Sequence, residues 1–297
     1  TGAEAEPPPP RAAVRLGEHA IGNGIFRVEA NPGAPGIDIR RDGSPVFAGA
    51  GLGVVTVDDA WGSWGGMADE PASLDLSSVR HHWSIAASEV LEDGPERALL
   101  AVRLTGGQSR LDLHLSLAHS RPVVDVAARL FLDERSARVK LVLPAGGDRA
   151  TFEVLGGQVD RGPAGEVPGG RWVRLHTDRG PVGFASDALY GFDLKDGTLR
   201  ASVARASRYA NDSFTPPDAD PWHPVVDCGE LRFRFLLTTG TEAERDLPRL
   251  ARELEMPPVA LCVAPKPGDL PRHGSLMALD PAGLQLLALK PAEDGHG

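Results

Sequence analysis

Two tryptophans stand three residues apart in the glycine-rich stretch Asp58-Asp-Ala-Trp-Gly-Ser-Trp-Gly-Gly66. Indole rings pack well against the faces of sugar rings, and carboxylates accept hydrogen bonds from sugar hydroxyls. We therefore predict that Trp61 and Trp64 contact a carbohydrate. An alternative is equally compatible with the sequence, namely that the two indoles close one end of a hydrophobic core.

A second polar stretch, Arg205-Ala-Ser-Arg-Tyr-Ala-Asn-Asp212, follows an alternating segment that begins at Leu199. In a regular strand Arg205 would share the apolar face of Leu199 and Val203. A buried guanidinium needs an anionic partner. We expect that partner to be Asp212 or Asp227.

The same stretch offers a second candidate contact with substrate. We predict that Arg205, Tyr209 and Asp212 line a polar groove at the edge of the fold, and that Asp227 belongs to the same site. The alternative is a structural ion pair beneath a loop.

Established catalytic motifs are missing from the sequence, including the nucleophile elbow, the phosphate-binding loop and the His-Glu-x-x-His zinc helix. Asp218, Asp220, His223 and Asp227 form a polar stretch whose carboxylates and backbone carbonyls could bind calcium, which takes oxygen ligands, but Asp-Pro turn chemistry explains much of that stretch. His223 and Asp227 are also the one pair that could act as general acid and base in a mutarotase. We assign no catalytic and no metal-binding residue to this chain.

The charge balance excludes one class of partner. The 297 residues include 31 Lys and Arg against 41 Asp and Glu, a net charge of −10. Nucleic-acid binding needs clustered cations, so we expect no nucleic-acid partner. No apolar run approaches the ~20 residues that span a bilayer, so we expect no membrane partner.

Two cysteines, Cys228 and Cys262, exclude a disulfide framework, and we expect buried thiols in a cytoplasmic protein.

Alternation of apolar and polar residues predicts the architecture. The segment Leu111-Asp-Leu-His-Leu-Ser-Leu117 places its leucines on one face and its polar residues on the other. Residues 124–132, 139–143 and 231–237 follow the same pattern, and Gly-rich turns separate such segments. The sequence therefore predicts an all-β fold, a large antiparallel β-sandwich. Leucines at 247, 250 and 254 predict one helix near residues 246–255.

The predicted organisation has four parts. An acidic, Pro-rich linker covers 1–12, and the β-sandwich domain covers 13–245. A short helix and a Pro-rich linker occupy 246–272, and 273–297 begins a C-terminal β segment. The first residues lack the basic and apolar regions of a signal peptide. The last residues stop where another turn and strand would follow, so we expect a piece of a longer protein.

Several segments, in this order, resemble the C-terminal region of the family 38 glycoside hydrolases, the α-mannosidases. They are Gly24-Ile-Phe-Arg-Val-Glu29, the Asp-Ala-Trp-x-x-Trp stretch, Val123-Val-Asp-Val126 with Val139-Lys-Leu-Val-Leu-Pro144, Phe152-Glu-Val with Asp160-Arg161, Gly183-Phe-Ala-Ser-Asp-Ala-Leu-Tyr-Gly-Phe-Asp193, Leu199-Arg-Ala-Ser-Val-Ala-Arg-Ala-Ser-Arg-Tyr-Ala210, Asp227-Cys-Gly-Glu-Leu-Arg-Phe-Arg-Phe235 and Leu286-Leu-Ala-Leu-Lys-Pro-Ala-Glu-Asp-Gly295. The chain departs from the family at Asp227-Cys-Gly-Glu-Leu, where many relatives have Asp-x-Gly-x-His. The family's further strands after the Glu-Asp-Gly turn are missing.

The resemblance implies a mutarotase-like supersandwich that follows an upstream catalytic barrel. That barrel would carry a zinc ion and an Asp nucleophile for retaining hydrolysis of α-mannosides. Its His-x-His-x-Asp zinc motif has no counterpart here, so we carry over no zinc ligand and expect no cofactor in this chain.

We therefore expect a non-catalytic sandwich of an α-mannosidase, acting in mannose metabolism. It would support the barrel and contact an α-mannoside or oligosaccharide. The alternative is a free-standing carbohydrate-binding module.

Overall fold

The computed structural model describes residues 14–59, 78–207, 209, 224–264, 267–269, 271, 273–275, 277–279, 286 and 288–295. The chain divides into two compact units, Thr1–Pro258 and Val259–Gly297. The described residues of the second unit form no strand or helix. Because other residues of 273–297 lie outside the described part, the C-terminal β segment stays a prediction.

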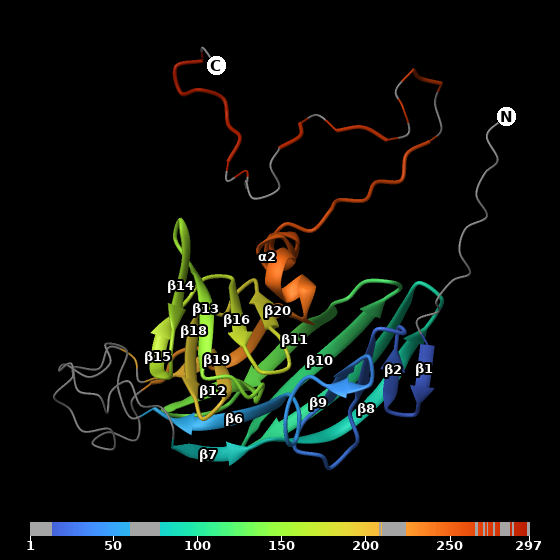
Figure 1. The fold of residues 1–297 in the computed structure, drawn as a ribbon. Coiled ribbons are helices and arrows are strands. Elements are labelled where there is room, and N and C mark those ends of the chain that lie inside the picture. The colour runs from blue at the N-terminus through green and yellow to red at the C-terminus, as the bar shows by residue number, and fades with distance from the viewer. Residues whose placement is uncertain are drawn as a thin grey trace. The chain divides into compact units, whose positions relative to one another are not determined.

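The first unit is built from antiparallel strands in three sheets (Figure 1). The five-stranded sheet contains, in spatial order, β1 (Val14–Gly17), β2 (Ala20–Gly22), β3 (Phe26–Glu29), β4 (Asp38–Arg41) and β5 (Ser44–Pro45). The six-stranded sheet contains β15 (Ala164–Pro168), β18 (Gly191–Lys195), β19 (Thr198–Ala206), β12 (Ala137–Leu143), β6 (Gly53–Asp58) and β7 (Val79–His82). The nine-stranded sheet contains β14 (Gly157–Arg161), β13 (Arg149–Val154), β16 (Trp172–His176), β17 (Val182–Ser186), β20 (Gly229–Thr239), β11 (Val124–Leu132), β10 (Ser109–Ala118), β9 (Arg97–Gly106) and β8 (Ser84–Asp93).

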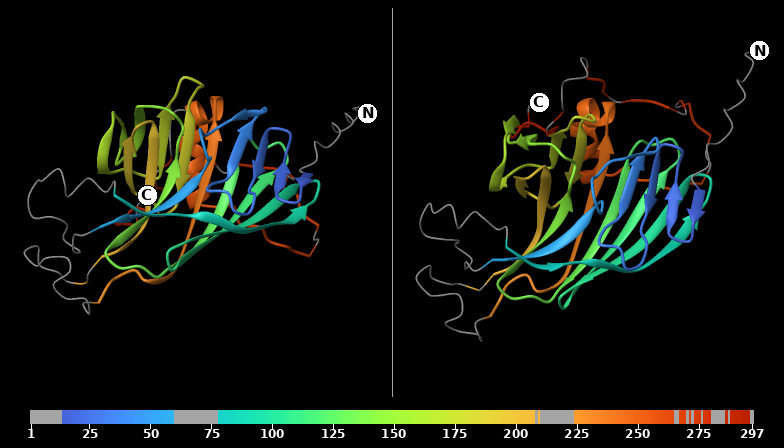
Figure 2. Two further views of the ribbon diagram at one scale, coloured as in Figure 1. Left: turned by 90° about the horizontal axis from the view of Figure 1, so that it is seen from below. Right: turned by 60° about the horizontal axis from the view of Figure 1, so that its bottom comes forward.

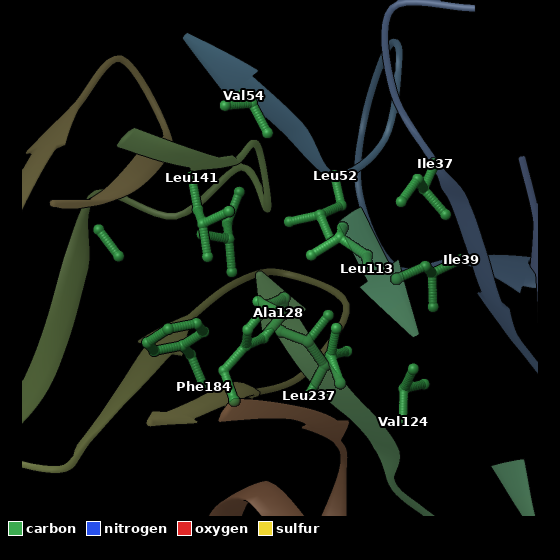
Figure 3. Packing of buried hydrophobic residues seen from close by; sticks show 14 of the residues in the cluster. Ile37, Ile39, Leu52, Val54, Leu113, Val124, Ala128, Leu141, Phe184 and Leu237 are labelled. Atoms are coloured by element: carbon green, nitrogen blue, oxygen red, sulfur yellow. The ribbon is translucent and has the colours of Figure 1, made fainter. Parts of the chain in front are cut away.

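The three sheets share one hydrophobic core. β1 and β2 of the five-stranded sheet contact β8 and β9 at one end of the nine-stranded sheet, and β6 of the six-stranded sheet also contacts β9; Figure 2 shows this arrangement from two further sides. Buried residues of all three sheets join a single cluster (Figure 3), among them Ile39, Leu141, Leu113, Phe184 and Leu237. The predicted all-β antiparallel sandwich is therefore confirmed.

The alternating segments form the predicted strands. In β10 every second residue from Ser109 to Leu117 is buried, while His114 is exposed. In β11 the buried positions run from Val124 to Leu132, again in alternation. The pattern exists because one face of each strand lies on the core and the other faces away from it.

The predicted helix is α2 (Leu247–Glu255), which follows a π-helical turn (Glu242–Asp246). Leu247, Leu250 and Ala251 are buried in a small cluster with Trp172 and Leu236 on the outer face of the nine-stranded sheet. This helix thus covers the outer face of the nine-stranded sheet around β16, β17 and β20. Among the described elements, its main contacts do not extend to the strands at the β8 end of that sheet.

The cysteines differ from expectation. Cys228 and Cys262 are both free, but both are exposed rather than buried. Cys228 lies just before β20, where the chain enters the sheet from a loop, and its thiol contacts the Glu134 carbonyl at 3.3 Å. Among the described helices, none is long and apolar enough to cross a membrane.

Candidate functional site

Three neighbouring strands of the six-stranded sheet bring Asp59 and Arg205 together at the place where these strands end, which we call the edge site. β12 lies between β6 and β19, with Ala137 opposite Asp58 on one side and Ala206 on the other. The end of β6, the start of β12 and the end of β19 therefore coincide. Asp59 and Arg205, 146 residues apart in sequence, meet at this edge.

Asp59 is held between two arginines. Its carboxylate accepts hydrogen bonds from Arg205 Nε (2.6 Å) and Nη2 (3.0 Å), and from Arg138 Nη2 (3.1 Å). The Asp59 side chain is 0% exposed, while those of Arg138 and Arg205 are 13% and 26% exposed. Arg138 and Arg205 are direct cross-strand partners. Like charges in that position repel, so the buried carboxylate is what allows the two guanidiniums to lie side by side.

The ion pairs continue along the outer face of the same sheet. Arg138 Nη1 donates to Glu166 Oε1 at 2.8 Å, and Lys140 Nζ donates to Glu166 Oε2 at 2.5 Å. Lys140 also donates to Asp193, which accepts from Arg200 Nε at 2.6 Å. Lys140 is fully buried, and a buried ammonium is tolerated only when carboxylates surround it.

Glu166 shows the electrostatic consequence of this arrangement. Burial by itself raises the pKa of its carboxyl. The nearby charges of Lys140 and Arg138, with hydrogen bonds from Lys140 and Ser202, outweigh burial and hold that pKa below its usual value of 4.5. Glu166 therefore stays ionised to lower pH than an ordinary glutamate, and it continues to compensate the cations around it there.

The face on which Arg205 lies differs from the sequence prediction. The pairing of β12 with β19 shifts register between Val139 and Lys140, so that Val139 faces Ala204 but Lys140 faces Ser202. The extra residue, Val203, packs on the hydrophobic core. A bulge of this kind reverses the alternation after it. Arg205 consequently lies on the outer face with Arg138, where it bonds to Asp59, a partner that the sequence analysis did not name. The expected pairing with Asp212 stays a prediction, because Asp212 lies outside the described residues.

The other predicted residues are only partly covered by the described structure. Tyr209 is 59% exposed, and its backbone N–H donates to the Pro224 carbonyl at 2.8 Å. Asp227 is exposed, with a left-handed φ of 60°, and follows Val226, whose N–H donates to Ser207 just after β19. Trp61, Trp64 and Asp212 lie outside the described residues.

Comparison with known protein families decides the assignment. Residues 55–220, more than half of the chain, match the family model "Glycosyl hydrolases family 38 C-terminal domain". The chain belongs to this family. The expected family resemblance is thereby confirmed.

Solved structures give the family 38 domain the same fold. It aligns with an α-mannosidase from Enterococcus faecalis V583 at a TM-score of 0.67 and 13% identity, over 85% of this chain and 33% of that one. A second glycosyl hydrolase family 38 protein from Enterococcus faecalis aligns at 0.64 and 13% identity, over 81% and 32%. The chain thus spans about a third of the length of these proteins. Comparison with curated protein sequences gives no match.

Sequence reasoning missed most of the buried ion pairs of the family 38 domain. It named Arg205 but not Asp59, Glu166 or Asp193 as partners. One signal was available: Arg138 and Lys140 alternate with apolar residues, which places both on the outer face of their strand. The carboxylates that neutralise them come from other strands, and sequence spacing carries no information on that.

The described residues of the domain offer no metal site. Among them, no group of three or more His, Cys, Asp or Glu side chains is placed to hold a metal ion. We assign no residue of this chain to zinc. The ion pairs around Asp59 hold the ends of β6, β12 and β19 together. They also place polar side chains at these strand ends.

Proposed function

We propose that this chain is the non-catalytic sandwich of an α-mannosidase. It supports a catalytic barrel that precedes it and adds contacts to an α-mannoside or oligosaccharide at the edge around Asp59. Membership of the family and the alignment with a third of an α-mannosidase support this proposal. Hydrolysis and the zinc ion belong to the barrel in this proposal.

The proposed sugar contact rests on one observation, the buried position of Asp59. Its carboxylate joins β6, β12 and β19 through Arg138 and Arg205. The stretch with Trp61 and Trp64 follows directly on Asp59 in sequence. A site of this kind benefits from a rigid base, because contacts held by packed strands lose little entropy when ligand binds.

The first test compares the chain alone with the protein encoded when the coding sequence upstream of Thr1 is included. We expect the longer protein to contain the barrel and to hydrolyse an aryl α-mannoside, and the chain alone to release no product. Turnover by the chain alone, or an upstream region without a barrel, would contradict the proposal.

The second test concerns the sugar contact. In the longer protein, Trp61→Ala should raise KM for an oligosaccharide substrate several-fold, because a stacking surface is removed. The control is Tyr190→Ala, which removes an aromatic ring that is 48% exposed directly before β18, and it should leave KM unchanged. Equal effects of the two changes would refute a sugar-contact role for Trp61.

A further inference from the structure

The outer face of the nine-stranded sheet contains a groove that the proposed function does not use. Its volume is about 850 Å³, and its lining crosses β8, β9, β10, β11 and β20. That volume lies within the ~300–1,000 Å³ typical of sites for small molecules. Neighbouring strands are ~4.8 Å apart, so five strands span about 19 Å. The groove is thus long enough for a ligand with several linked rings.

Small side chains form the floor of the groove. His114 of β10 lies directly between Ala101 of β9 and Ala127 of β11 in the strand register. Ala87 of β8 is a further small residue in the lining. His114 and Ala127 are exposed. The methyl groups leave open space on both sides of the imidazole, which can donate or accept a hydrogen bond.

Four arginines line the groove, and each is already bonded to a carboxylate. These pairs are Arg103 Nε with Asp112 Oδ1 (2.7 Å), Arg129 Nη2 with Glu230 Oε2 (2.5 Å), Arg232 Nε with Glu230 Oε1 (2.7 Å) and Arg234 Nε with Asp187 Oδ2 (2.9 Å). The arginine side chains remain substantially exposed, from 41% for Arg234 to 73% for Arg232. The lining therefore presents guanidinium donors beside carboxylate acceptors.

The paired arginines and carboxylates of the groove favour one class of ligand. Because carboxylates compensate the guanidiniums, the groove has no large excess of positive charge to attract an anion. An apolar ligand would leave the charged groups without hydrogen bonds, which is costly. Sugar hydroxyls both donate and accept, so they satisfy both members of such pairs. From this we infer that the groove binds a neutral oligosaccharide.

A nearby aromatic ring supports the same ligand. Phe131 stands two residues after Arg129 on β11, and alternate residues of a strand point to the same face. Its side chain is 46% exposed. An exposed ring beside paired arginines and carboxylates offers a stacking surface for the next sugar unit.

The test measures binding of the 297-residue chain by isothermal titration calorimetry. The probes are neutral tetrasaccharides of mannose, glucose and galactose, and tetragalacturonate as the anionic probe. We expect saturable binding of at least one neutral probe, with an affinity that added salt changes little. Ala127→Trp should weaken that binding at least tenfold, because the indole fills the floor. The matched control is Gln158→Trp, on exposed β14, which should bind as the wild type does.

Further variants keep the outcome decisive. Arg232→Ala changes a largely exposed side chain, so it should fold normally and still weaken binding several-fold. Binding that Ala127→Trp removes belongs to the groove, whereas a separate binding event that only Trp61→Ala removes would belong to the sugar contact proposed above. Failure of all three neutral probes, tighter binding of tetragalacturonate, or full affinity in both Ala127→Trp and Arg232→Ala would overturn the inference.

Discussion

Replacing Asp59 by asparagine removes one negative charge from the centre of the edge site while keeping nearly the same shape. The asparagine oxygen can still accept a hydrogen bond, but its NH2 group faces guanidinium N–H groups that need an acceptor. Arg138 retains Glu166 as a partner at 2.8 Å. Arg205 loses the bonds at 2.6 and 3.0 Å that it makes to Asp59.

The magnitude follows from burial. Removing one member of a buried ion pair costs about 3–5 kcal/mol, because the remaining charge is left uncompensated. Arg138 keeps Glu166, and Arg205 is 26% exposed and has further contacts, so the expected loss lies at the low end of this range, near ~3 kcal/mol. For a unit of this size, each kcal/mol lowers Tm by about 2–4 °C, so we expect a fall of about 6–12 °C.

The neighbouring residue provides a matched control. Asp58 also bonds to an arginine, Arg80, at 2.7 Å, but its side chain is 47% exposed. Exposed pairs contribute at most about 1 kcal/mol, so Asp58→Asn should lower Tm by a few degrees at most. Thermal and urea unfolding followed by circular dichroism would measure both variants. If Asp59→Asn is no less stable than Asp58→Asn, the argument that burial makes Asp59 the anchor is wrong.

Three further predictions concern stability. Because the pKa of Glu166 is lowered on folding, its contribution is fully present above pH 4.5 and is lost as pH falls through the lowered value; Glu166→Gln should flatten the acid limb of a stability–pH profile. A Cβ at Gly106 would lie 2.3 Å from Trp83 Cδ1, so Gly106→Ala should cost about 1–3 kcal/mol by overpacking, whereas Gly157→Ala, with open space around it, should cost little in the same urea titration. Leu250→Ala should cost about 2–4 kcal/mol because Leu250, on the buried side of α2, is 4% exposed, and unchanged stability would contradict the packing of that helix.

Local patterns were sufficient for much of the fold. Alternation has a period of two residues in a strand, so it is visible within a few positions, and β10 and β11 appear where the apolar–polar pattern placed them. The helix at 247–255 was equally visible from its leucines. The family assignment also follows from the order of short segments along the chain, and the family match at 55–220 confirms it.

What only the tertiary structure decided is the environment of each charged residue. Arg205 was named from the sequence as a charge in need of a partner, but the bulge at Val203 and the position of β12 between β6 and β19 are what bring Asp59 to it. The groove on the nine-stranded sheet likewise depends on strand order, which sets His114 between two alanines. Strand pairing is non-local: it depends on the summed packing of many distant residues, so sequence spacing reveals that a face is polar without revealing what lies beside it.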